Sequence, residues 1–294
     1  MSPFYEELFG SDDRPAILDL IHTHIDHIKE IHDILQSHPL YDPRIHDDLW
    51  KLRFYLSQKS TKKATKAAKA TLEFRDKYKL DQLGDIRHHW IELQRTYQRE
   101  NKNIYESHTE DDTSVYTIPD CNRGLIIYWK FKGIDQQKIT KTLDEDDFLN
   151  IYILMNEFIF QVNDEVTRRT GRLTKALKVI DFEGANLLKD VNPTYIKRDA
   201  NLNKKLQDFY PQNLGSMLVV NAPGVFNTMW AFFKPFFPKR MVEKVNLVKP
   251  KKRVDDLKCF TKYISEDHLP ECYGGNISSN PSSFGLFRFA DGNQ

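Results

Sequence analysis

The amino-acid sequence predicts an α/β protein in which an N-terminal helical module precedes a mostly parallel β-sheet floor flanked by helices. Two observations lead to this prediction. The first half of the chain spaces its apolar residues three and four apart, which is typical of amphipathic helices. The second half alternates short, strand-like apolar runs with helical segments, and right-handed crossovers between such strands favour a parallel sheet. With 294 residues, the chain can bury a large core without disulfide or metal staples.

Three helices are expected in the first half. Residues Pro15–Gln36 carry a stripe of isoleucines and leucines, which predicts one amphipathic helix. Asp47 or Asp48 can cap a second helix, which extends over Leu49–Leu56. A third helix is expected over Lys59–Tyr78, with alanines facing inward and lysines facing solvent.

The second half is expected to contain a long helix over Asp146–Thr170. Acidic residues precede it, Arg168 and Arg169 suit its C-terminus, and Gly171 can end it. The polar, acidic stretch Asn101–Asp112 separates the two halves as a loop or a domain boundary. The other expected elements are strands over Leu125–Phe131, Ala176–Phe182, Met217–Val220 and Lys244–Val248, and helices over Asn192–Phe209 and Gly224–Phe237.

Charge and cysteine content narrow the function classes. Lys and Arg total 43 and Asp and Glu total 42, so the net charge is +1, which argues against a protein that covers nucleic acid with its whole surface. Cys121, Cys259 and Cys272 lie far apart, which indicates free thiols in a reducing compartment. The sequence has neither a signal-peptide pattern nor an apolar run of membrane-spanning length. We therefore expect a soluble, cytoplasmic protein.

The usual catalytic and nucleotide-binding motifs are missing from the sequence. It contains no G-x-G-x-x-G, P-loop, G-x-S-x-G or H-E-x-x-H motif. Asp181 ends an expected strand and could hold a metal or a ribose, but without a glycine-rich partner a strand end facing a turn is favoured. Among the five histidines of residues 22–38, only His24 and His27 share a helix face, so a solvated face is favoured over a zinc site. We expect no enzymatic activity, no metal and no other cofactor.

Four motifs follow one another between Lys175 and Gly275. They are the strand Leu177–Asp181, the helix end Tyr210–Gly215, the segment Val219–Phe226 followed by Trp230 and by Phe233-Lys234-Pro235-Phe236, and Leu269-Pro270-Glu271-Cys272-Tyr273-Gly274-Gly275. In this order they resemble the CRAL-TRIO lipid-binding family, which includes phosphatidylinositol transfer proteins and carriers of tocopherol and retinaldehyde. The segment Leu52–Tyr78 is similar to the helical module that precedes this domain. Cys272 departs from the family, which usually has a longer polar residue there.

The resemblance implies a hydrophobic lipid pocket between the sheet and the helix Gly224–Phe237, which would act as a gate. It divides the chain into an extension (1–46), a helical module (47–110), a lipid-binding domain (111–275) and a tail (276–294). Apolar residues surround the helix on nearly every side, so it is buried or lies against lipid, and a plain core helix is the alternative. Pro235 is expected to bend or stop it. The expected pocket and gate residues are Phe226, Met229, Trp230, Phe233, Phe236 and Phe237.

The resemblance also implies where a phospholipid headgroup would bind. In the phosphoinositide-transferring members, two lysines and an acidic residue contact the inositol phosphate, and Lys59 and Lys234 match the two lysines. The acidic position is Asp199 if a two-residue insertion is allowed, and Asn201 if it is not. A solvated lysine at a helix edge is an equal alternative for Lys59. Lys234 lies among four phenylalanines, where an ammonium is expected to need a partner.

A basic segment follows the expected gate. Residues 234–262 hold ten basic and three acidic residues. Its peak, formed by Lys249, Lys251, Lys252 and Arg253, is predicted to attract anionic membrane surfaces, with a solvated loop as the alternative.

The function predicted from these features is lipid binding and lipid transfer. We expect a monomer that shields phosphatidylinositol, and also a second lipid, from water. It is expected to touch membranes transiently and not to bind nucleic acid. The alternatives are a carrier of a tocopherol, retinoid or prenol, a lipid-sensing adaptor that acts on a protein partner, and an enzyme of phospholipid metabolism.

Overall fold

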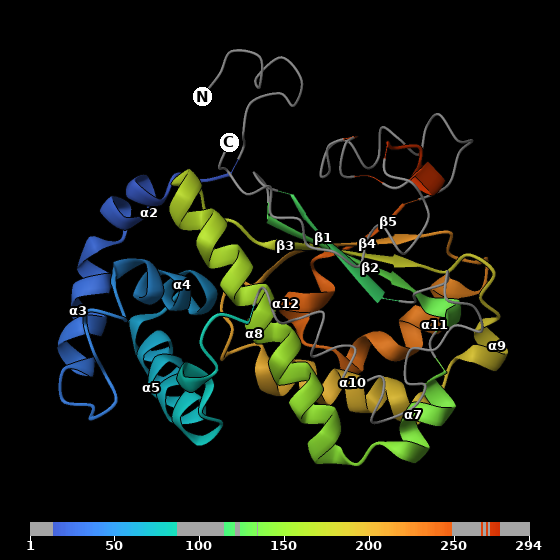
Figure 1. The fold of residues 1–294 in the computed structure, drawn as a ribbon, viewed down its shortest axis with the longest axis horizontal. Coiled ribbons are helices and arrows are strands. Elements are labelled where there is room, and N and C mark those ends of the chain that lie inside the picture. Colours follow the sequence, from blue (N-terminus) through green and yellow to red (C-terminus); the bar gives the residue numbers. More distant parts are fainter. Residues whose placement is uncertain are drawn as a thin grey trace.

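The computed structural model describes residues 14–86, 115–120, 124–133, 135–248, 266, 269 and 271–276, and it gives the backbone alone for residues 115–120, 130, 133 and 272. Figure 1 shows the helical module on one side of the molecule and the sheet with its covering helices on the other. The expected loop 101–112, the basic residues 249–253 and the tail after residue 276 lie outside the described residues.

From here on, the helical module is the group of four N-terminal helices, α2 (Ile17–Thr23), α3 (Ile25–Leu35), α4 (Asp48–Gln58) and α5 (Thr61–Lys77). It therefore combines two helices of the expected extension 1–46 with two of the expected module 47–110. The side chain of Asp47 caps α4 by accepting from the backbone N–H of Trp50 at 2.9 Å, as expected. The prediction of one helix over Pro15–Gln36 was wrong, because the backbone leaves the helical conformation at His24. This break lets α2 pack on α4 while α3 packs on both α4 and α5.

The sheet has five strands in the order β1-β2-β3-β4-β5, and β2 to β5 are parallel. The predicted mostly parallel sheet is therefore confirmed, but β1 was not expected. It pairs antiparallel with β2 at the edge of the sheet and contains Pro119, a residue that weakens the sequence signal of a strand and is tolerated at sheet edges. The strands are β1 (Val115–Asp120), β2 (Gly124–Lys130), β3 (Ala176–Asp181), β4 (Leu214–Val220) and β5 (Val245–Leu247).

Two helices of the second half begin at the expected signals, whereas three short helices, α7, α9 and α12, were not expected. The side chain of Asp144 caps the long helix α8, and Gly171 ends it with a φ of 66°. The side chain of Asn192 caps α10, and Pro193 is its first residue. The helix expected over Gly224–Phe237 ends earlier, because a 3₁₀ turn containing Pro235 replaces its last part. The helices are α7 (Gln136–Thr142), α8 (Glu145–Thr170), α9 (Leu187–Asp190), α10 (Pro193–Leu206), α11 (Phe226–Phe233) and α12 (Lys239–Val242).

Alternation along the strands gives the sheet two different faces. Leu177 and Val179 of β3 point to the face that packs against Tyr273, while Lys178 and Ile180 point to the opposite face. Helix α8 covers the start of that opposite face and packs on β2, and α10 and α11 lie beyond it (Figure 1). Within the described ranges, no helix combines the length and the apolar content that crossing a bilayer requires.

Two arginines, the buried Arg53 and the partly buried Arg75, join the helical module to α8. Arg53 of α4 is 1% exposed and donates to Asp164 at 3.2 Å. Arg75 of α5 donates to both carboxylate oxygens of Glu157, at 3.0 and 3.1 Å, and Glu157 is itself 1% exposed. A bidentate arginine–carboxylate contact such as Arg75–Glu157 fixes the orientation of the guanidinium relative to the carboxylate. The position of the module on α8 is therefore set by polar contacts as well as by apolar packing.

The substitution Arg75→Met is expected to lower the free energy of unfolding by about 3–5 kcal/mol, because it leaves Glu157 buried without its partner. Urea denaturation measures this loss. The double variant Arg75→Met with Glu157→Met should recover most of it, since neither charge of this pair then remains. Arg44→Ala is the control, because the Arg44–Asp42 pair is exposed and its loss should have little effect. An equal loss in Arg44→Ala and Arg75→Met would contradict the prediction.

Candidate functional site

An apolar cavity of about 900 Å³, its mouth included, lies between the sheet and helices α10 and α11. The floor is formed by the side chains of β2, β3 and β4 that point away from Tyr273, among them Trp129, Ile180 and Val219. Tyr195 and Ile196 of α10 form one wall. The predicted hydrophobic pocket above a sheet floor is therefore present.

Five of the six expected gate residues line this cavity: Phe226, Met229, Trp230, Phe233 and Phe237. Phe236 does not line it and is 37% exposed. The outer side of α11 is also apolar, since Phe232 is 64% exposed, and the exposed Val225 precedes the helix directly. Helix α11 therefore presents apolar side chains both to the cavity and to the outside, as the sequence pattern predicted.

Two charged side chains, one from the floor and one from the wall formed by α10, also line the apolar cavity. Lys178 comes from the floor, where its Nζ lies 3.5 Å from the centre of the Trp129 ring. Burial lowers the pKa of Lys178 to about 8, although the Asp199 carboxylate acts in the opposite direction. Asp199 comes from α10, and burial raises its pKa against the effects of Lys178, Tyr152 and Asn203.

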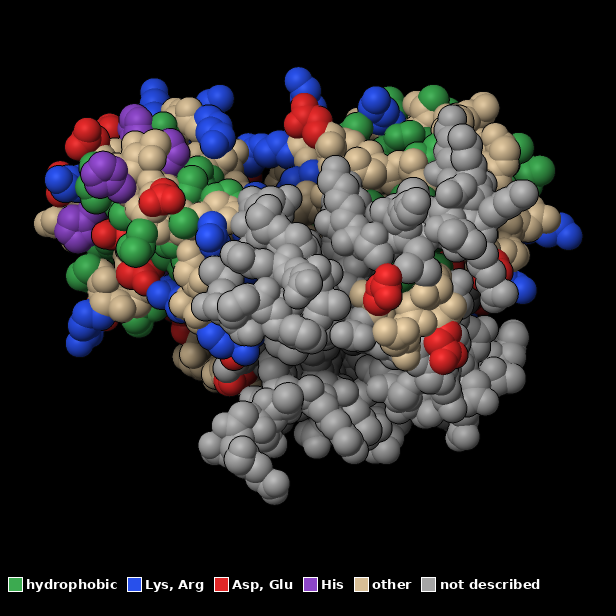
Figure 2. Space-filling view, turned by 90° about the horizontal axis from the view of Figure 1, so that it is seen from above, with side chains coloured by type: hydrophobic (Ala, Val, Ile, Leu, Met, Phe, Trp, Pro, Cys, Tyr) green, Lys and Arg blue, Asp and Glu red, His purple; other side chains and the backbone are tan. Residues whose placement is uncertain are grey.

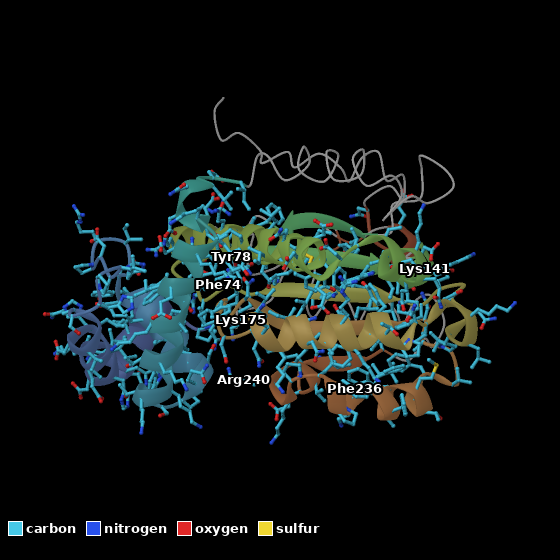
Figure 3. All side chains as sticks on the ribbon, turned by 90° about the horizontal axis from the view of Figure 1, so that it is seen from below. Phe74, Tyr78, Lys141, Lys175, Phe236 and Arg240 are labelled. Carbon is cyan, nitrogen blue, oxygen red and sulfur yellow. The ribbon has the colours of Figure 1, made fainter. Side chains whose placement is uncertain are left out.

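A second, more polar groove lies where the helical module meets the domain. Four of its lining residues are basic: Lys59, Lys175, Arg240 and Lys244. Glu243 is the acidic residue among the lining groups that the structure describes. Figure 3 shows Lys175 and Arg240 beside the helical module and Lys141 at the far end of the molecule. The groove is therefore suited to an anionic group.

The basic residues of the groove influence one another. Burial lowers the pKa of Lys175, and the charges of Lys59 and Arg53 lower it further. Burial also lowers the pKa of Lys244 to about 8, with added effects from Lys175 and Arg240. An anion in the groove would reduce this repulsion and favour the charged form of each lysine.

Lys59 reaches the groove through an unusual backbone conformation. It follows α4 directly and has a φ of 52°, in the left-handed region that glycine adopts most easily. Its backbone N–H donates to Tyr55 O at 2.7 Å, which closes the helix.

The groove and the cavity adjoin. Met241 lines both of them. Lys175 of the groove and Lys178 of the cavity are three residues apart on extended chain, which corresponds to about 10 Å. A molecule with an anionic end and an apolar chain could therefore occupy both at once.

The predicted headgroup residues separate into two groups. Lys59 lines the groove and Asp199 lines the cavity, whereas Lys234 and Asn201 are exposed and line neither. The expectation that Lys234 needs a partner was wrong, because the 3₁₀ turn holds its side chain in solvent. The predicted membrane patch of Lys249, Lys251, Lys252 and Arg253 lies outside the described residues.

Sequence reasoning missed four basic residues of these sites: Lys175, Lys178, Arg240 and Lys244. Lys178 did carry a signal, since it is the only charged residue between the ends of an otherwise apolar strand, Ala176–Asp181. The other three are surface-type residues in the sequence, and only the packing of the module beside β3 and α12 brings them together.

The histidines of residues 22–38 lie on or beside α2 and α3, and Figure 2 shows histidine side chains gathered at one end of the molecule. His27 stacks on Tyr55 and hydrogen-bonds Thr61, and His32 hydrogen-bonds Tyr41. Among the residues that the structure describes, no three potential metal ligands come together.

The sheet, the helical module and the roofed apolar cavity define a class of α/β proteins that enclose apolar ligands. A profile of the CRAL/TRIO domain matches residues 111–275. This match covers more than half of the chain, so the chain belongs to the CRAL/TRIO domain family, a family of lipid-binding and transfer proteins. The resemblance identified from the four motifs is confirmed.

Several relatives share this domain. The SEC14 cytosolic factor of Kluyveromyces lactis is 26% identical over 123 residues, which are 41% of this chain and 38% of that protein. The phosphatidylinositol/phosphatidylcholine transfer protein SFH12 of Arabidopsis thaliana is 24% identical over 158 residues, 53% of this chain and 28% of that protein. The matches therefore span less than half of either relative. The crystal structure of Sfh5 has the same fold, with a TM-score of 0.52, 14% identity, and coverage of 92% of this chain and 90% of that one.

Lys178→Met is expected to raise the free energy of unfolding more at pH 7 than at pH 10. The pKa of Lys178 is about 8 in the folded protein and 10.5 ordinarily, so between these values the unfolded chain binds more protons and the wild type gains stability as the pH rises. The advantage of the variant should therefore shrink by about 2–3 kcal/mol across this window. Urea denaturation at both pH values measures it, and a constant advantage would show that the ammonium is not buried.

Proposed function

We propose that this protein binds a phospholipid with its acyl chain in the apolar cavity and its phosphorylated headgroup in the basic groove, and that it transfers this lipid between membranes. The observation that carries the proposal is the junction of the two sites at Met241. An apolar cavity alone suits many hydrophobic molecules, and a basic groove alone suits many anions. Because the two sites lie next to each other, they favour a molecule that has both an apolar chain and an anionic group.

The free energy of acyl chains explains why such a protein is useful. Each CH₂ group moved from a bilayer into water costs about 0.8 kcal/mol, so a sixteen-carbon chain costs on the order of 12 kcal/mol. A lipid therefore leaves its membrane very slowly without help. A cavity lined by Trp129, Phe226, Trp230 and Phe233 replaces the bilayer interior and removes most of this cost. Transfer of this kind exchanges a bound lipid and breaks no covalent bond.

Phosphatidylinositol is the proposed phospholipid. The groove supplies Lys59, Lys175 and Arg240 for the phosphate, and charge-assisted hydrogen bonds of this kind are stronger than neutral ones. The same groove is lined by amide side chains, namely Asn156, Asn203, Gln207, Gln212 and Asn213, which suit the hydroxyl groups of an inositol ring. The name of the Arabidopsis relative, a phosphatidylinositol/phosphatidylcholine transfer protein, supports this choice.

We propose that α11 is the part of the protein that enters the membrane. Its outer side carries the exposed Phe232, the 3₁₀ turn that follows it carries the exposed Phe236, and its inner side closes the cavity. Movement of this helix would open the cavity into lipid, where the exposed rings also find an apolar environment. The 3₁₀ turn that contains Pro235 is the proposed hinge.

Lys175→Ala is expected to slow the transfer of labelled phosphatidylinositol between vesicles about tenfold, because a hydrogen bond to a charged group contributes roughly 1.5–3 kcal/mol. Lys141→Ala is the matched control, since Lys141 is an exposed lysine far from the groove (Figure 3). Lys59→Ala should resemble Lys175→Ala. Unchanged transfer in both groove variants would contradict the headgroup assignment.

Phe232→Ser is expected to weaken binding to phospholipid vesicles about tenfold or more without lowering stability, since burying one phenylalanine contributes roughly 1.5–3 kcal/mol. Vesicle sedimentation measures the binding. Leu18→Ser is the control, because Leu18 of α2 is 80% exposed and lies on the helical module. If both variants lose vesicle binding equally, α11 is not the membrane-facing element.

The lipid itself can be identified directly. Mass spectrometry of an organic extract of the purified protein should detect a phospholipid, with phosphatidylinositol among the species. If the extract contains a neutral hydrophobic molecule and no phospholipid, that molecule is the ligand and the phospholipid assignment is wrong. If the extract contains no lipid, lipid binding itself is contradicted.

A further inference from the structure

The Lys178 ammonium is an unusual group to find in an apolar cavity. Its side chain is half-buried by surface area because the cavity opens beside it, yet protein surrounds its charge closely enough to lower its pKa to about 8. It lies over the Trp129 ring, and among the described residues it makes neither a hydrogen bond nor an ion pair. A buried ammonium without hydrogen-bond acceptors is costly, so this position favours an occupant that supplies one.

One carboxylate oxygen of Asp199 accepts hydrogen bonds from neighbouring side chains, and the other accepts none from the described residues. Tyr152 Oη and Asn203 Nδ2 both donate to its Oδ1, the latter at 3.1 Å. Within the described part of the chain, no group donates to its Oδ2, and Asp199 does not pair directly with Lys178. The cavity therefore presents an ammonium with three N–H hydrogen-bond donors from its floor and an unused carboxylate acceptor from its wall.

A hydroxyl group matches both partners, because it accepts one hydrogen bond and donates another. A carboxylate would accept from Lys178 but face the charge of Asp199. A trimethylammonium group would meet Lys178 with a like charge, and an alkane would leave both groups unpaired. Ligands with the same apolar chain should therefore differ in affinity only through the hydrogen bonds and the charge of their polar end, and the hydroxyl should bind best.

We propose that Lys178 and Asp199 form a polar subsite that selects a neutral lipid alcohol, whose hydroxyl accepts from Lys178 and donates to Asp199 while its chain fills the apolar cavity. This inference rests on the proposed function, because it takes the cavity to be a lipid site, and it names the chemical class of the second lipid. The alcohol uses the cavity alone, whereas a phospholipid also needs the basic groove.

The test compares three ligands with the same apolar chain: 1-dodecanol, its methyl ether and dodecanoate. Trp129 and Trp230 line the cavity, so titration of tryptophan emission reports binding. Wild-type protein should bind dodecanol more tightly than dodecanoate. Lys178→Met should weaken dodecanol binding about tenfold, in line with the loss of a hydrogen bond to a charged group. Lys141→Met is the control and should leave all three affinities unchanged.

Asp199→Asn tests the second half of the subsite. Asparagine keeps an oxygen for Tyr152 and Asn203 but removes the negative charge, so this variant should prefer dodecanoate to dodecanol. The methyl ether cannot donate, so its affinity should be similar in wild type and Asp199→Asn. Far-UV circular dichroism and thermal melting of each variant establish that it is folded before titration.

The outcomes separate this inference from the proposed function. If Lys178→Met and wild type bind dodecanol equally, or if wild type prefers dodecanoate, the alcohol subsite is refuted even when phosphatidylinositol transfer is intact. If none of the three ligands binds, both the subsite and the lipid cavity are refuted. Weaker dodecanol binding in Lys178→Met together with retained phosphatidylinositol transfer supports both.

Discussion

The ion pairs of Arg53 and Arg75 with carboxylates of α8 are the constraint on which the candidate site depends. They hold the helical module in one place against α8. Lys59 belongs to the module, whereas Lys175 and Lys244 belong to the sheet domain, so the basic groove exists only while the two parts are docked. A smaller set of contacts, Gln58 and Arg240 with Asp208, ties the module to α12 on the other side of the groove. Buried polar pairs here determine geometry more than they add stability.

The same sheet serves both core and cavity because its strands alternate. Leu177 and Val179 complete a packed core on one side, and Lys178 and Ile180 face the cavity on the other. A shift of register by one residue would exchange these roles and place the ammonium in the core. Pairing of Lys178 with Met217 in β4 and with Ile127 in β2 fixes the register on both sides. The position of one charge inside an apolar space thus follows from ordinary strand pairing.

Much of this architecture could be predicted from the sequence, because local signals agree with the final fold. Asp144 and Gly171 mark both ends of α8, and Asn192 with Pro193 marks the start of α10. That the apolar residues of α11 line a cavity could be predicted, because a helix that is apolar on nearly every side is buried or lies against lipid. What could not be predicted depends on tertiary packing. The break at His24 follows from two different packing partners, and Lys175, Arg240 and Lys244 meet only because distant segments do.

The left-handed backbone of Lys59 has a consequence for how this chain balances stability and specificity. A side chain in this conformation costs about 1 kcal/mol relative to glycine, the residue that most often ends a helix in this way. The chain tolerates the steric penalty at a position where an ammonium enters the groove. An otherwise identical protein with glycine there would be the more stable molecule and would have one fewer positive charge for an anion. Local strain at this helix end thus accompanies the placement of a positive charge directly at the end of a helix instead of on a longer loop.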